Sequence, residues 1–433
     1  MPGVQEFFPG DWHKSITAPT RLPIRLAVVG GSTAGVETAQ GIVRSFSPDQ
    51  VHVTLIDRYD HHYHKVGAVR GIMDRSFADL LWIPFTNVFH GAKPTRDDSY
   101  PNHQFLQGEV TQVLDGHLLL QDSPFIVEYD YLVLATGSSS AHPFSPLLPS
   151  RALATKVNGQ FADDMAYAEN ILIIGGGPLG VEIAGEIKHA SPDKNITIVH
   201  RGEQLLSSPL SLKFRRRVTQ RVEELGVNVI LGDSIDLQDE ANSLSLEMSV
   251  SANSPYLITT RQGIPIEADK IIQATGTRVY TEFLQSLETD TRLGIIGPDE
   301  RIRVLPTLQI KDDNYPHIFA VGDVNDIKCV KNACKASHQV RILLRNLKLC
   351  IGAELRNPNP GQRPVLPKLR TFEDSESYLV LALGPQKGIC LFPRGLIFGD
   401  WAARVLKGRD LQVAKKWRQM GIPFPAPTTI PAS

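Results

Sequence analysis

Cysteine is scarce in this chain. Its 433 residues include only four: Cys329, Cys334, Cys350 and Cys390. So few cysteines exclude a fold held together by disulfide bonds and favour a reducing compartment. Cysteine and histidine pairs at the spacing of zinc ligands are also missing, so we expect no metal site. A group of histidines, His61, His62 and His64, is interpreted as lying beside a cofactor or at the surface.

An excess of charge of either sign is absent as well. The formal net charge is −1 and the pI is about 6.9, so the chain lacks the basic field that nucleic-acid binding requires. It also lacks any run of roughly 18 consecutive apolar residues, which predicts that no helix spans a membrane. A general nucleic-acid-binding role and an integral membrane protein are therefore both disfavoured.

Targeting signals are missing from the amino-terminal stretch, MPGVQEFFPGDWHKS. It has no basic start followed by an apolar segment, as a secretory signal would, and position 2 is proline rather than the glycine of a myristoylation site. We interpret residues 1–23 as a loosely packed extension. We expect a cytoplasmic protein that is not secreted, with peripheral contact to a mitochondrial or lipid-droplet membrane as an open alternative.

Glycine is concentrated at two places where the pattern changes from strand to helix. Residues 27–36 are AVVGGSTAGV and residues 172–181 are LIIGGGPLGV. Each begins with an apolar run typical of a buried parallel strand, and a helical pattern follows the glycine-rich turn. Another apolar strand comes after each helix, at residues 51–57 and 195–200. This order predicts two Rossmann-like units in one α/β chain.

The first turn has Gly30 and Gly35 but carries serine, Ser32, at the middle position. Small residues in such a turn make the tight bend, admit a pyrophosphate and let helix and strand pack closely. The following helix directs free N–H groups at the phosphates. Asp57 ends the next strand, where a carboxylate accepts hydrogen bonds from an adenosine ribose. We therefore predict a dinucleotide site, with Ser32 as a departure from the motif.

The second turn matches the motif completely, with Gly175, Gly177 and Gly180. Two such units predict two dinucleotides, and FAD with NAD(P)H is the economical pair because a flavin accepts hydride and passes electrons on singly or in pairs. The strand after this turn ends on His200 and Arg201 rather than on a carboxylate. Arg201 is a candidate for the 2′-phosphate of NADPH, and a surface arginine without coenzyme preference is the alternative.

Further motifs follow in a characteristic order: LATGS at 134–138, QATGT at 273–277 and AVGDV at 320–324. Together with the two glycine turns, they resemble the two-dinucleotide flavoprotein fold over residues 24–350. Within that fold the chain resembles the apoptosis-inducing-factor-like branch, which includes ferroptosis suppressor proteins and, more distantly, type II NADH dehydrogenases. The segment HKVGAVR (64–70) and the tail segments LALGPQKG and RVLKGRDLQVAKKW carry this resemblance.

The resemblance implies a domain organisation and an activity. The FAD-binding domain is expected from residues 24–160 and 290–355, the NAD(P)-binding domain from 161–289, and a small α+β carboxy-terminal region from 368–433. In that last region we predict two strands around GPQKG and then one amphipathic helix. The implied activity is transfer of hydride from NAD(P)H to FAD and of electrons to a small-molecule acceptor, a quinone or quinone-like compound.

The resemblance also implies roles for particular residues. Glu182 is expected near flavin and nicotinamide, and Lys331 beside the flavin ring, where a cation would stabilise negative charge on the reduced flavin. Asp323 is expected to bind the ribityl chain, and backbone groups near Glu109 and Val110 to hold the adenine. The other expected cofactor-binding residues are Lys65, Arg70, Gly137, Gly276 and Gly322.

Three other interpretations compete with this one. A disulfide reductase needs a cysteine pair over the flavin, and the C-x₄-C spacing of Cys329 and Cys334 comes too late in the chain, so we treat it as chance. A flavin monooxygenase is the alternative enzyme, although residues 140–168 lack its signature. A signalling or scaffold protein that contains flavin is the alternative without catalysis.

The aromatic residues of the tail add one more question. They are Phe392, Phe398, Trp401 and Trp417. They suit an apolar acceptor pocket or a membrane-facing patch, whereas any single one of them is more simply a core residue.

Overall fold

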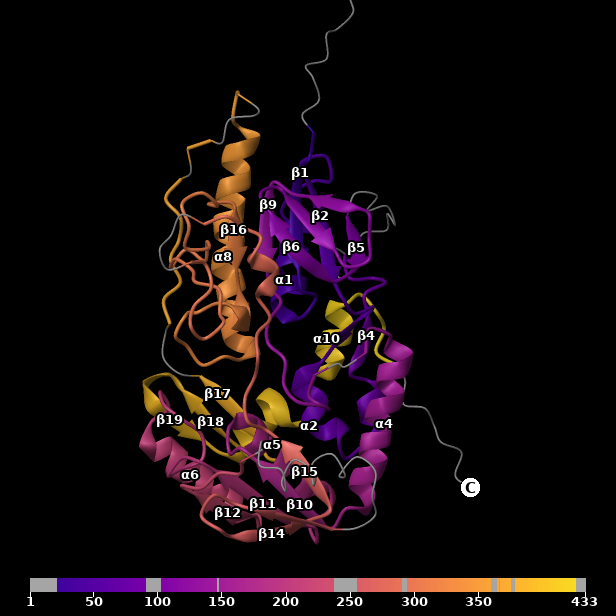
Figure 1. Cartoon of the computed structure of the whole chain (residues 1–433), viewed down its shortest axis with the longest axis vertical. Coiled ribbons are helices and arrows are strands. Elements are labelled where there is room, and N and C mark those ends of the chain that lie inside the picture. The colour runs from indigo at the N-terminus through magenta and orange to yellow at the C-terminus, as the bar shows by residue number, and fades with distance from the viewer. Residues whose placement is uncertain are drawn as a thin grey trace, which may run out of the picture.

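The computed structural model describes residues 22–90, 103–145, 148–236, 255–289, 294–359, 364–365, 367–374 and 378–425. Of the predicted amino-terminal extension, only residues 22 and 23 fall in these ranges. The described chain forms an elongated molecule with one parallel sheet near each end of its long axis (Figure 1). None of the described helices is both long enough and apolar enough to cross a membrane.

The first sheet has five parallel strands in the order β16-β9-β1-β2-β5. Their bounds are β1 Ile24–Val29, β2 Val51–Asp57, β5 Gln104–Gln107, β9 Tyr131–Leu134 and β16 Ile318–Ala320. Because side chains alternate along β1, Leu26 and Val28 face one side, with the core of helices α1 (Thr33–Val43) and α8 (Ala333–Leu355). Ala27 and Val29 face the other side. The first predicted unit is therefore confirmed.

An antiparallel meander covers that other side of the first sheet. It consists of β6 (Val110–Leu114), β7 (His117–Leu120) and β8 (Ile126–Glu128). Its buried residues Val113 and Leu118 share a core with Ala27 and Val29. The strand β5, which precedes the meander, pairs with β2 in the parallel sheet, and β9, which follows the meander, returns to that sheet.

The second sheet has four parallel strands in the order β12-β11-β10-β15. They are β10 Asn170–Ile174, β11 Asn195–His200, β12 Asn228–Leu231 and β15 Lys270–Gln273. Two helices, α5 (Pro178–Ala190) and α6 (Leu212–Glu223), pack with this unit, and a hairpin of β13 (Tyr256–Thr259) and β14 (Pro265–Ala268) shares a core with Leu172 and Ile174. This arrangement confirms the second predicted unit.

Short elements and the long helix α4 lie outside the two parallel sheets. The short ones are β3 (His61–Tyr63), 3-10 turns at Lys65–Gly67, Glu282–Leu284 and Gly322–Val324, α2 (Ala68–Gly71), α3 (Arg75–Asp79) and β4 (Trp82–Pro84). The long helix, α4, spans Arg151–Tyr167, so the boundary expected at residue 160 falls inside it. The domain limits themselves stay a prediction.

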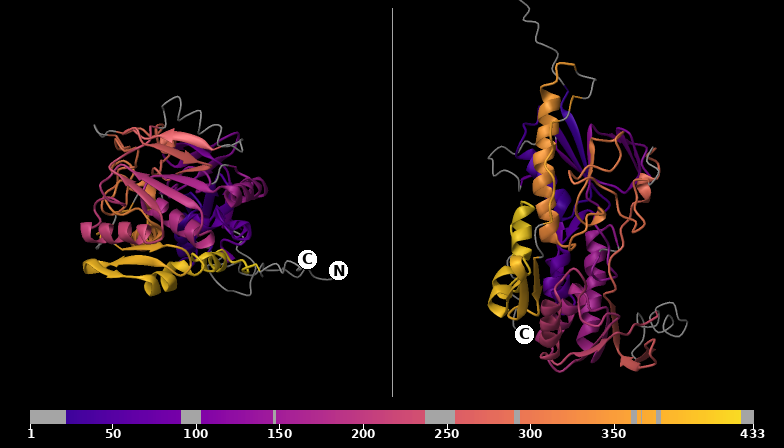
Figure 2. Two further views of the ribbon diagram at one scale, coloured as in Figure 1. Left: turned by 90° about the horizontal axis from the view of Figure 1, so that it is seen from below. Right: turned by 90° about the vertical axis from the view of Figure 1, so that its left-hand side faces the viewer.

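The carboxy-terminal region forms a layer along one side of the molecule and spans both halves (Figure 2). It contains an antiparallel sheet of β17 (Leu379–Ala382), β18 (Gly388–Phe392) and β19 (Leu396–Phe398), with a 3-10 turn at Pro393–Gly395. The first two strands confirm the expected pair around GPQKG. The third strand, β19, was not predicted. Only three residues separate it from β18, so the sequence reads as one continuous segment.

The single amphipathic helix expected after this sheet is wrong. Residues 400–419 divide into α9 (Asp400–Ala403), a π-helix at Arg404–Gly408 and α10 (Val413–Gln419). Leu411 and Gln412 break the helix with left-handed φ values of 48° and 63°. The break has a physical cause: α10 packs on the first half, where Trp417 Nε1 donates to Leu80 O and Gln40 Nε2 donates to Gln419 O. A straight helix would carry Trp417 away from that surface.

Candidate functional site

The first glycine turn is sterically fixed at Gly30 and Gly35. Gly30 has a φ of 104°, and a Cβ there would lie 2.4 Å from Ala135 O. A Cβ on Gly35 would lie 1.7 Å from Gly30 O. Both positions therefore require glycine, because a backbone carbonyl stands where a side chain would begin. Ser32 is the residue that caps the start of α1, and its side chain makes no capping hydrogen bond.

Asp57 holds the turn from the end of β2. Its carboxylate accepts hydrogen bonds from the Gly31 N–H and, at 2.9 Å, from the Tyr59 N–H. Burial raises the pKa of Asp57, and the two backbone N–H groups oppose that shift. The carboxylate is therefore anchored beside the turn, at the position where a ribose would meet it.

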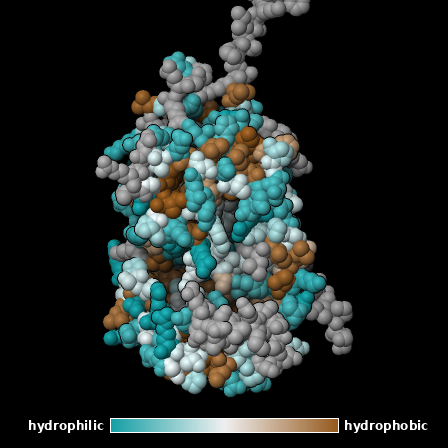
Figure 3. Space-filling model, in the orientation of Figure 1, coloured by the Kyte–Doolittle hydropathy of each residue, from teal (hydrophilic) through white to brown (hydrophobic). Residues whose placement is uncertain are grey.

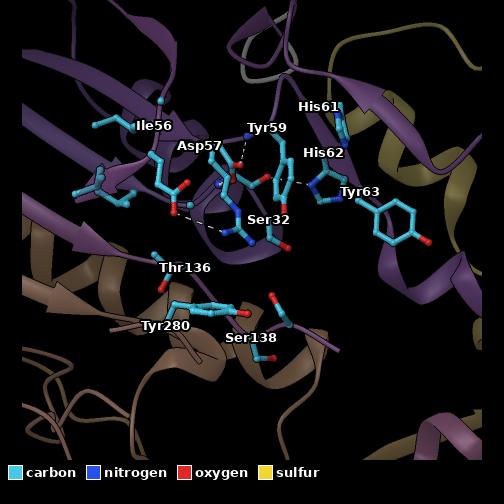
Figure 4. Close-up of a pocket in the computed structure, with 18 of the residues that line it drawn as sticks. Ser32, Ile56, Asp57, Tyr59, His61, His62, Tyr63, Thr136, Ser138 and Tyr280 are labelled. Carbon is cyan, nitrogen blue, oxygen red and sulfur yellow. Dashed lines mark hydrogen bonds and ion pairs between the residues drawn. The ribbon is translucent and has the colours of Figure 1, made fainter. Parts of the chain in front are cut away.

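A cavity opens in front of this turn (Figure 4). In the figure Asp57, Tyr59 and His62 lie on one side of it, and Thr136, Ser138 and Tyr280 lie across from them. The remaining described lining residues are Val29, Gly30, Gly31, Ser32, Ile56, Arg58, His61, Tyr63, Lys65, Gly108, Glu109, Val110, Ser139 and Phe283. Of the expected cofactor-binding residues, the cavity thus brings together Gly30, Ser32, Asp57, Lys65 and Val110.

One wall of the cavity carries a buried network of charges. Lys65 Nζ donates to Ser138 O, and Ser138 Oγ donates to Asp323 Oδ2 at 2.8 Å. Burial lowers the pKa of Lys65, while the nearby carboxylates of Asp323 and Asp57 oppose that shift. Thr136 Oγ1, which is also buried at the cavity, has no hydrogen-bond partner among the described residues. An orphaned hydroxyl and a lysine between two carboxylates fit a polar, phosphate-bearing cofactor.

The three histidines are buried, and none of them is a surface residue. His62 Nδ1 lies 3.0 Å from Gly31 O, and His64 Nε2 lies 2.7 Å from Leu411 O. Burial lowers the pKa of His62 and takes that of His64 to about 4, so both are neutral near pH 7. They tie the glycine turn and the carboxy-terminal region together. Across the described part of the chain, no three histidine, cysteine, aspartate or glutamate side chains gather as a metal site requires.

The second glycine turn repeats the construction of the first. A Cβ on Gly175 would lie 2.3 Å from Ala274 O, and one on Gly180 would lie 2.0 Å from Gly175 O. Gly177 differs, because a Cβ there would meet nothing within 4 Å. Gly177 caps α5 and Pro178 begins it, so the turn presents free N–H groups on an open side.

His200 occupies in the second unit the place that Asp57 has in the first. The Gly176 N–H donates to His200 Nδ1 at 3.2 Å, so His200 Nε2 carries the proton and points at Leu206 O, 3.4 Å away. Burial lowers the pKa of His200, and the cations Arg201 and Arg215 lower it further. The strand end is therefore neutral, with Arg201 exposed beside it.

Glu182 and Glu186 lie one turn apart on α5, and each pairs with a cation from another part of the chain. Lys407 Nζ lies 2.7 Å from Glu182 Oε2, and the Ala382 N–H donates to Glu182 Oε1. Arg70 makes two hydrogen bonds to Glu186, at 3.0 Å and 2.9 Å. Arg70 therefore lies outside the cavity lining and links α2 to α5. Sequence reasoning missed Lys407, since 225 residues separate it from Glu182.

The remaining expected residues are not among the described residues that line the cavity. Lys331 Nζ donates to Asn325 O at 2.8 Å, and burial lowers its pKa. Gly137 and Gly276 have φ values of 69° and 121°, with open space where a Cβ would stand. The Gly322 N–H donates to Gln339 Oε1 at 2.7 Å. Their predicted roles stay predictions.

Known proteins resemble the chain over most of its length. Apoptosis-inducing factor homolog B of Dictyostelium discoideum is 28% identical over 93% of this chain and 98% of its own. Ferroptosis suppressor protein 1 of Xenopus tropicalis is 26% identical over 93% and 97%. The FAD-dependent oxidoreductase FVFD30 of Flammulina velutipes is 30% identical over 77% and 93%. These relatives confirm the apoptosis-inducing-factor-like resemblance.

Solved structures share the fold. The sulfide:quinone oxidoreductase of Aquifex aeolicus superposes with a TM-score of 0.64 at 15% identity, over 93% of both chains. The NDH2 of Plasmodium falciparum in complex with NADH gives 0.62 at 13% identity, over 93% of this chain and all of the other. The model of the pyridine nucleotide-disulphide oxidoreductase family matches residues 24–339. The protein is therefore an FAD-dependent oxidoreductase that uses NAD(P)H, and it belongs to the pyridine nucleotide-disulphide oxidoreductase family.

Proposed function

We propose that the protein passes reducing equivalents from NAD(P)H through FAD to a quinone or quinone-like acceptor. The observation that carries the proposal is the cavity at the first glycine turn, whose described lining contains no cysteine. A disulfide substrate would need such a thiol beside the flavin. FAD supplies the hydride-accepting and electron-passing chemistry when bound. The sulfide:quinone oxidoreductase that shares the fold offers a precedent for a quinone acceptor.

The chain's own residues have positioning tasks in this reaction. The turn at Gly30 and the N-terminus of α1 hold a pyrophosphate, and Asp57 accepts from a ribose. Lys65 supplies a buried positive charge at the cavity wall. Glu182 and Lys407 fix the carboxy-terminal region against α5, which brings the strained residues Leu411 and Gln412 toward His64. Strained backbone of this kind is concentrated at functional sites, so we place the acceptor on that side.

The decisive experiment follows the flavin absorbance of the purified yellow protein under anaerobic conditions. NADPH or NADH should bleach it, and a quinone should restore the colour faster than a disulfide does. Absence of bleaching would favour the scaffold interpretation. Restoration by oxygen alone, with insertion of an oxygen atom into an added aromatic substrate, would favour the monooxygenase.

We propose NADPH as the preferred donor. A carboxylate at the end of β11 would repel a 2′-phosphate. Here His200 takes the place of that acidic residue, so the end of the strand is neutral. Arg201 is exposed at the same end, and the helix N-terminus at Gly177 faces the pyrophosphate side. Glu203 is the nearest following acid in the sequence, and it is exposed to solvent, where its charge is screened.

We also propose that the carboxy-terminal region touches a membrane that contains anionic lipids. Leu396, Phe398, Trp401 and Val405 are 55%, 45%, 76% and 65% exposed. Figure 2 shows this region as the outer layer on one side of the molecule. Basic residues accompany the apolar ones: Lys387, Arg394 and Arg404 are exposed, whereas the acidic Asp400 pairs with Arg221. Apolar side chains ringed by cations suit an anionic headgroup surface.

Replacing both Phe398 and Trp401 with serine should lower co-sedimentation with vesicles of phosphatidylcholine and phosphatidylserine at least fivefold, because two interfacial aromatics are lost. Tyr167→Ser is the matched control, since Tyr167 is 87% exposed on α4. Equal co-sedimentation of all three proteins would contradict the proposal. Conversion of a dimer to a monomer by the double substitution would assign the surface to a second copy instead. Trp417, at 5% exposure, is a core residue and takes no part.

A further inference from the structure

The helix α10 packs on the first half of the molecule at a site that contains three basic side chains. His62 belongs to β3, His64 follows that strand, and Lys416 comes from α10 itself. Their exposed fractions are 2%, 5% and 8%. The centres of the two imidazole rings lie 6.4 Å apart, and the charge of Lys416 acts on both rings. The three basic groups therefore share one buried interface.

Each imidazole ring in this interface is hydrogen-bonded in its neutral form. His62 Nδ1 donates to Gly31 O at 3.0 Å, and His64 Nε2 donates to Leu411 O at 2.7 Å. A carbonyl oxygen only accepts, so the ring proton sits on these two nitrogens and the other nitrogen of each ring carries none. A second proton on either ring would place a positive charge inside the interface, where it is costly.

The surroundings of the two rings oppose that second proton. Burial is the largest cause: it lowers the pKa of His62 and takes that of His64 to about 4. Nearby basic groups lower both pKa values further, whereas the carboxylate of Asp410 raises that of His64. The basic groups that act on His62 are Lys416, His64 and His61, and those that act on His64 are Lys416 and Lys407.

Lys416 is charged near pH 7 in spite of its burial. Burial takes its pKa to about 8, while the carboxylate of Glu37 on α1 raises that pKa and the neighbouring Lys415 lowers it. Lys416 Nζ donates to the neutral side chain of Gln419 at 2.7 Å. Glu37 is shared, because it also accepts a hydrogen bond from Ser337 Oγ at 2.9 Å. A proton added to either histidine thus meets a cation that is already present.

The position of α10 allows it to leave the interface without disturbing either parallel sheet. The helix follows two residues, Leu411 and Gln412, whose left-handed φ values oppose docking, whereas burial of Val413 and Trp417 favours it. The carboxy-terminal region, which ends in α10, lies at the outer edge of the described molecule in Figure 2. Figure 3 shows that the surface is hollowed near the level where the two halves meet.

We propose that α10 is an acid-released latch: protonation of His62 and His64 frees it from the first half of the molecule and loosens the wall of the cavity. The cavity is affected because His62 is one of its described lining residues and also holds Gly31 of the glycine turn. The inference does not depend on which acceptor the protein reduces. It makes the proton concentration a regulator of the cavity.

Docking weakens as the pH falls, because the docked form binds fewer protons than the released form. A released histidine has its ordinary pKa of about 6.5, and docking lowers the pKa of both rings. The equilibrium constant for release should therefore rise about hundredfold between pH 7.5 and pH 5.5, tenfold for each ring. Lys416 adds little in this range, because it stays largely protonated in both forms below its docked pKa of about 8.

Hydrogen exchange of the α10 amides in the FAD-bound protein measures this constant, once each rate is divided by the intrinsic rate at the same pH. The parent protein should show the hundredfold rise. His62→Asn and His64→Gln each keep a neutral N–H donor at the same place, so each should reduce the rise to about tenfold. The double variant should show no rise. His117→Gln is the matched control, because His117 is exposed on β7, and it should keep the parental response.

A constant that does not change with pH in the parent protein would overturn the latch. So would equal opening constants for α10 and for β10 in the second sheet, because the whole molecule would then be unfolding. The rate of FAD release, followed as a rise in flavin fluorescence after dilution, should increase over the same pH range in the parent and stay constant in the double variant. A constant rate in the parent would overturn the effect on the cavity wall.

A second variant tests the interface if the histidine variants do not fold. From pH 8 to pH 9 the constant for release should fall about fivefold in the parent protein, because Lys416 loses its proton in the docked form first. In Lys416→Met the constant should stay the same over this range. A fivefold fall in Lys416→Met as well would assign the response to other groups and contradict the latch.

Discussion

Replacing Arg70 with methionine is expected to lower the free energy of unfolding by about 3–5 kcal/mol, because it leaves the Glu186 carboxylate buried without a partner. The side chains of Arg70 and Glu186 are 13% and 2% exposed. Arg70 also donates to the carbonyls of Gly408 and Arg409, so one guanidinium joins α2, α5 and the carboxy-terminal region. Urea denaturation followed by circular dichroism and by flavin fluorescence measures the loss.

A second substitution separates this structural role from the cofactor contact implied by the family resemblance. Glu186→Leu in the Arg70→Met background should recover most of the loss, because an apolar pair of similar volume replaces the ion pair. Arg70→Met could instead keep its free energy of unfolding to within about 1 kcal/mol but bind FAD more weakly. That result would support the expectation that Arg70 binds the cofactor.

Arg201→Ala should lower kcat/KM with NADPH about tenfold and leave kcat/KM with NADH unchanged. A charge-assisted hydrogen bond to a phosphate contributes roughly 1.5–3 kcal/mol, and an exposed arginine lies at the lower end of that range. His200→Asp should act in the same direction and more strongly. The new carboxylate takes over the Gly176 N–H, as Asp57 does with Gly31, and repels the 2′-phosphate.

Binding measured without turnover provides the control for this prediction. The dissociation constant of 2′,5′-ADP should rise at least tenfold in both variants. That of 5′-AMP should stay the same in Arg201→Ala and should not rise in His200→Asp, because the new carboxylate can accept hydrogen bonds from the ribose. A matched substitution, Arg217→Ala, removes an exposed arginine from α6 and should change neither constant. If Arg201→Ala keeps the parental ratio of kcat/KM values, Arg201 has no part in coenzyme choice.

The sequence was sufficient for the parts of the molecule that depend on local pattern. Both glycine turns could be predicted, because apolar strands, glycines at fixed spacing and a following helix leave few other folds. The contacts at Gly30 and Gly175 explain why: a neighbouring carbonyl occupies the site of any Cβ. Asp57 and His200 could be placed for the same reason, since each ends the strand after its turn.

Contacts between distant segments could not be predicted. Nothing in the spacing of Glu182 and Lys407, or of Arg70 and Glu186, indicates that they meet, because tertiary packing alone brings them together. The break in the helix at Leu411 and Gln412 could not be predicted for a related reason. The amphipathic pattern continues across it, and only the docking of α10 on the first half requires the chain to turn there.

The order of elements along the chain has a consequence for synthesis on the ribosome. The second sheet and its helices come from one continuous stretch, 170–273, and can fold as soon as that stretch emerges. The sheet that begins at Ile24 must wait for β16 at residues 318–320, for α8, and then for α10 at residues 413–419. The part made first is thus finished last. A nascent chain cannot complete the cavity wall at Ser138 until Asp323 has been made, so we expect FAD to be loaded only after that point.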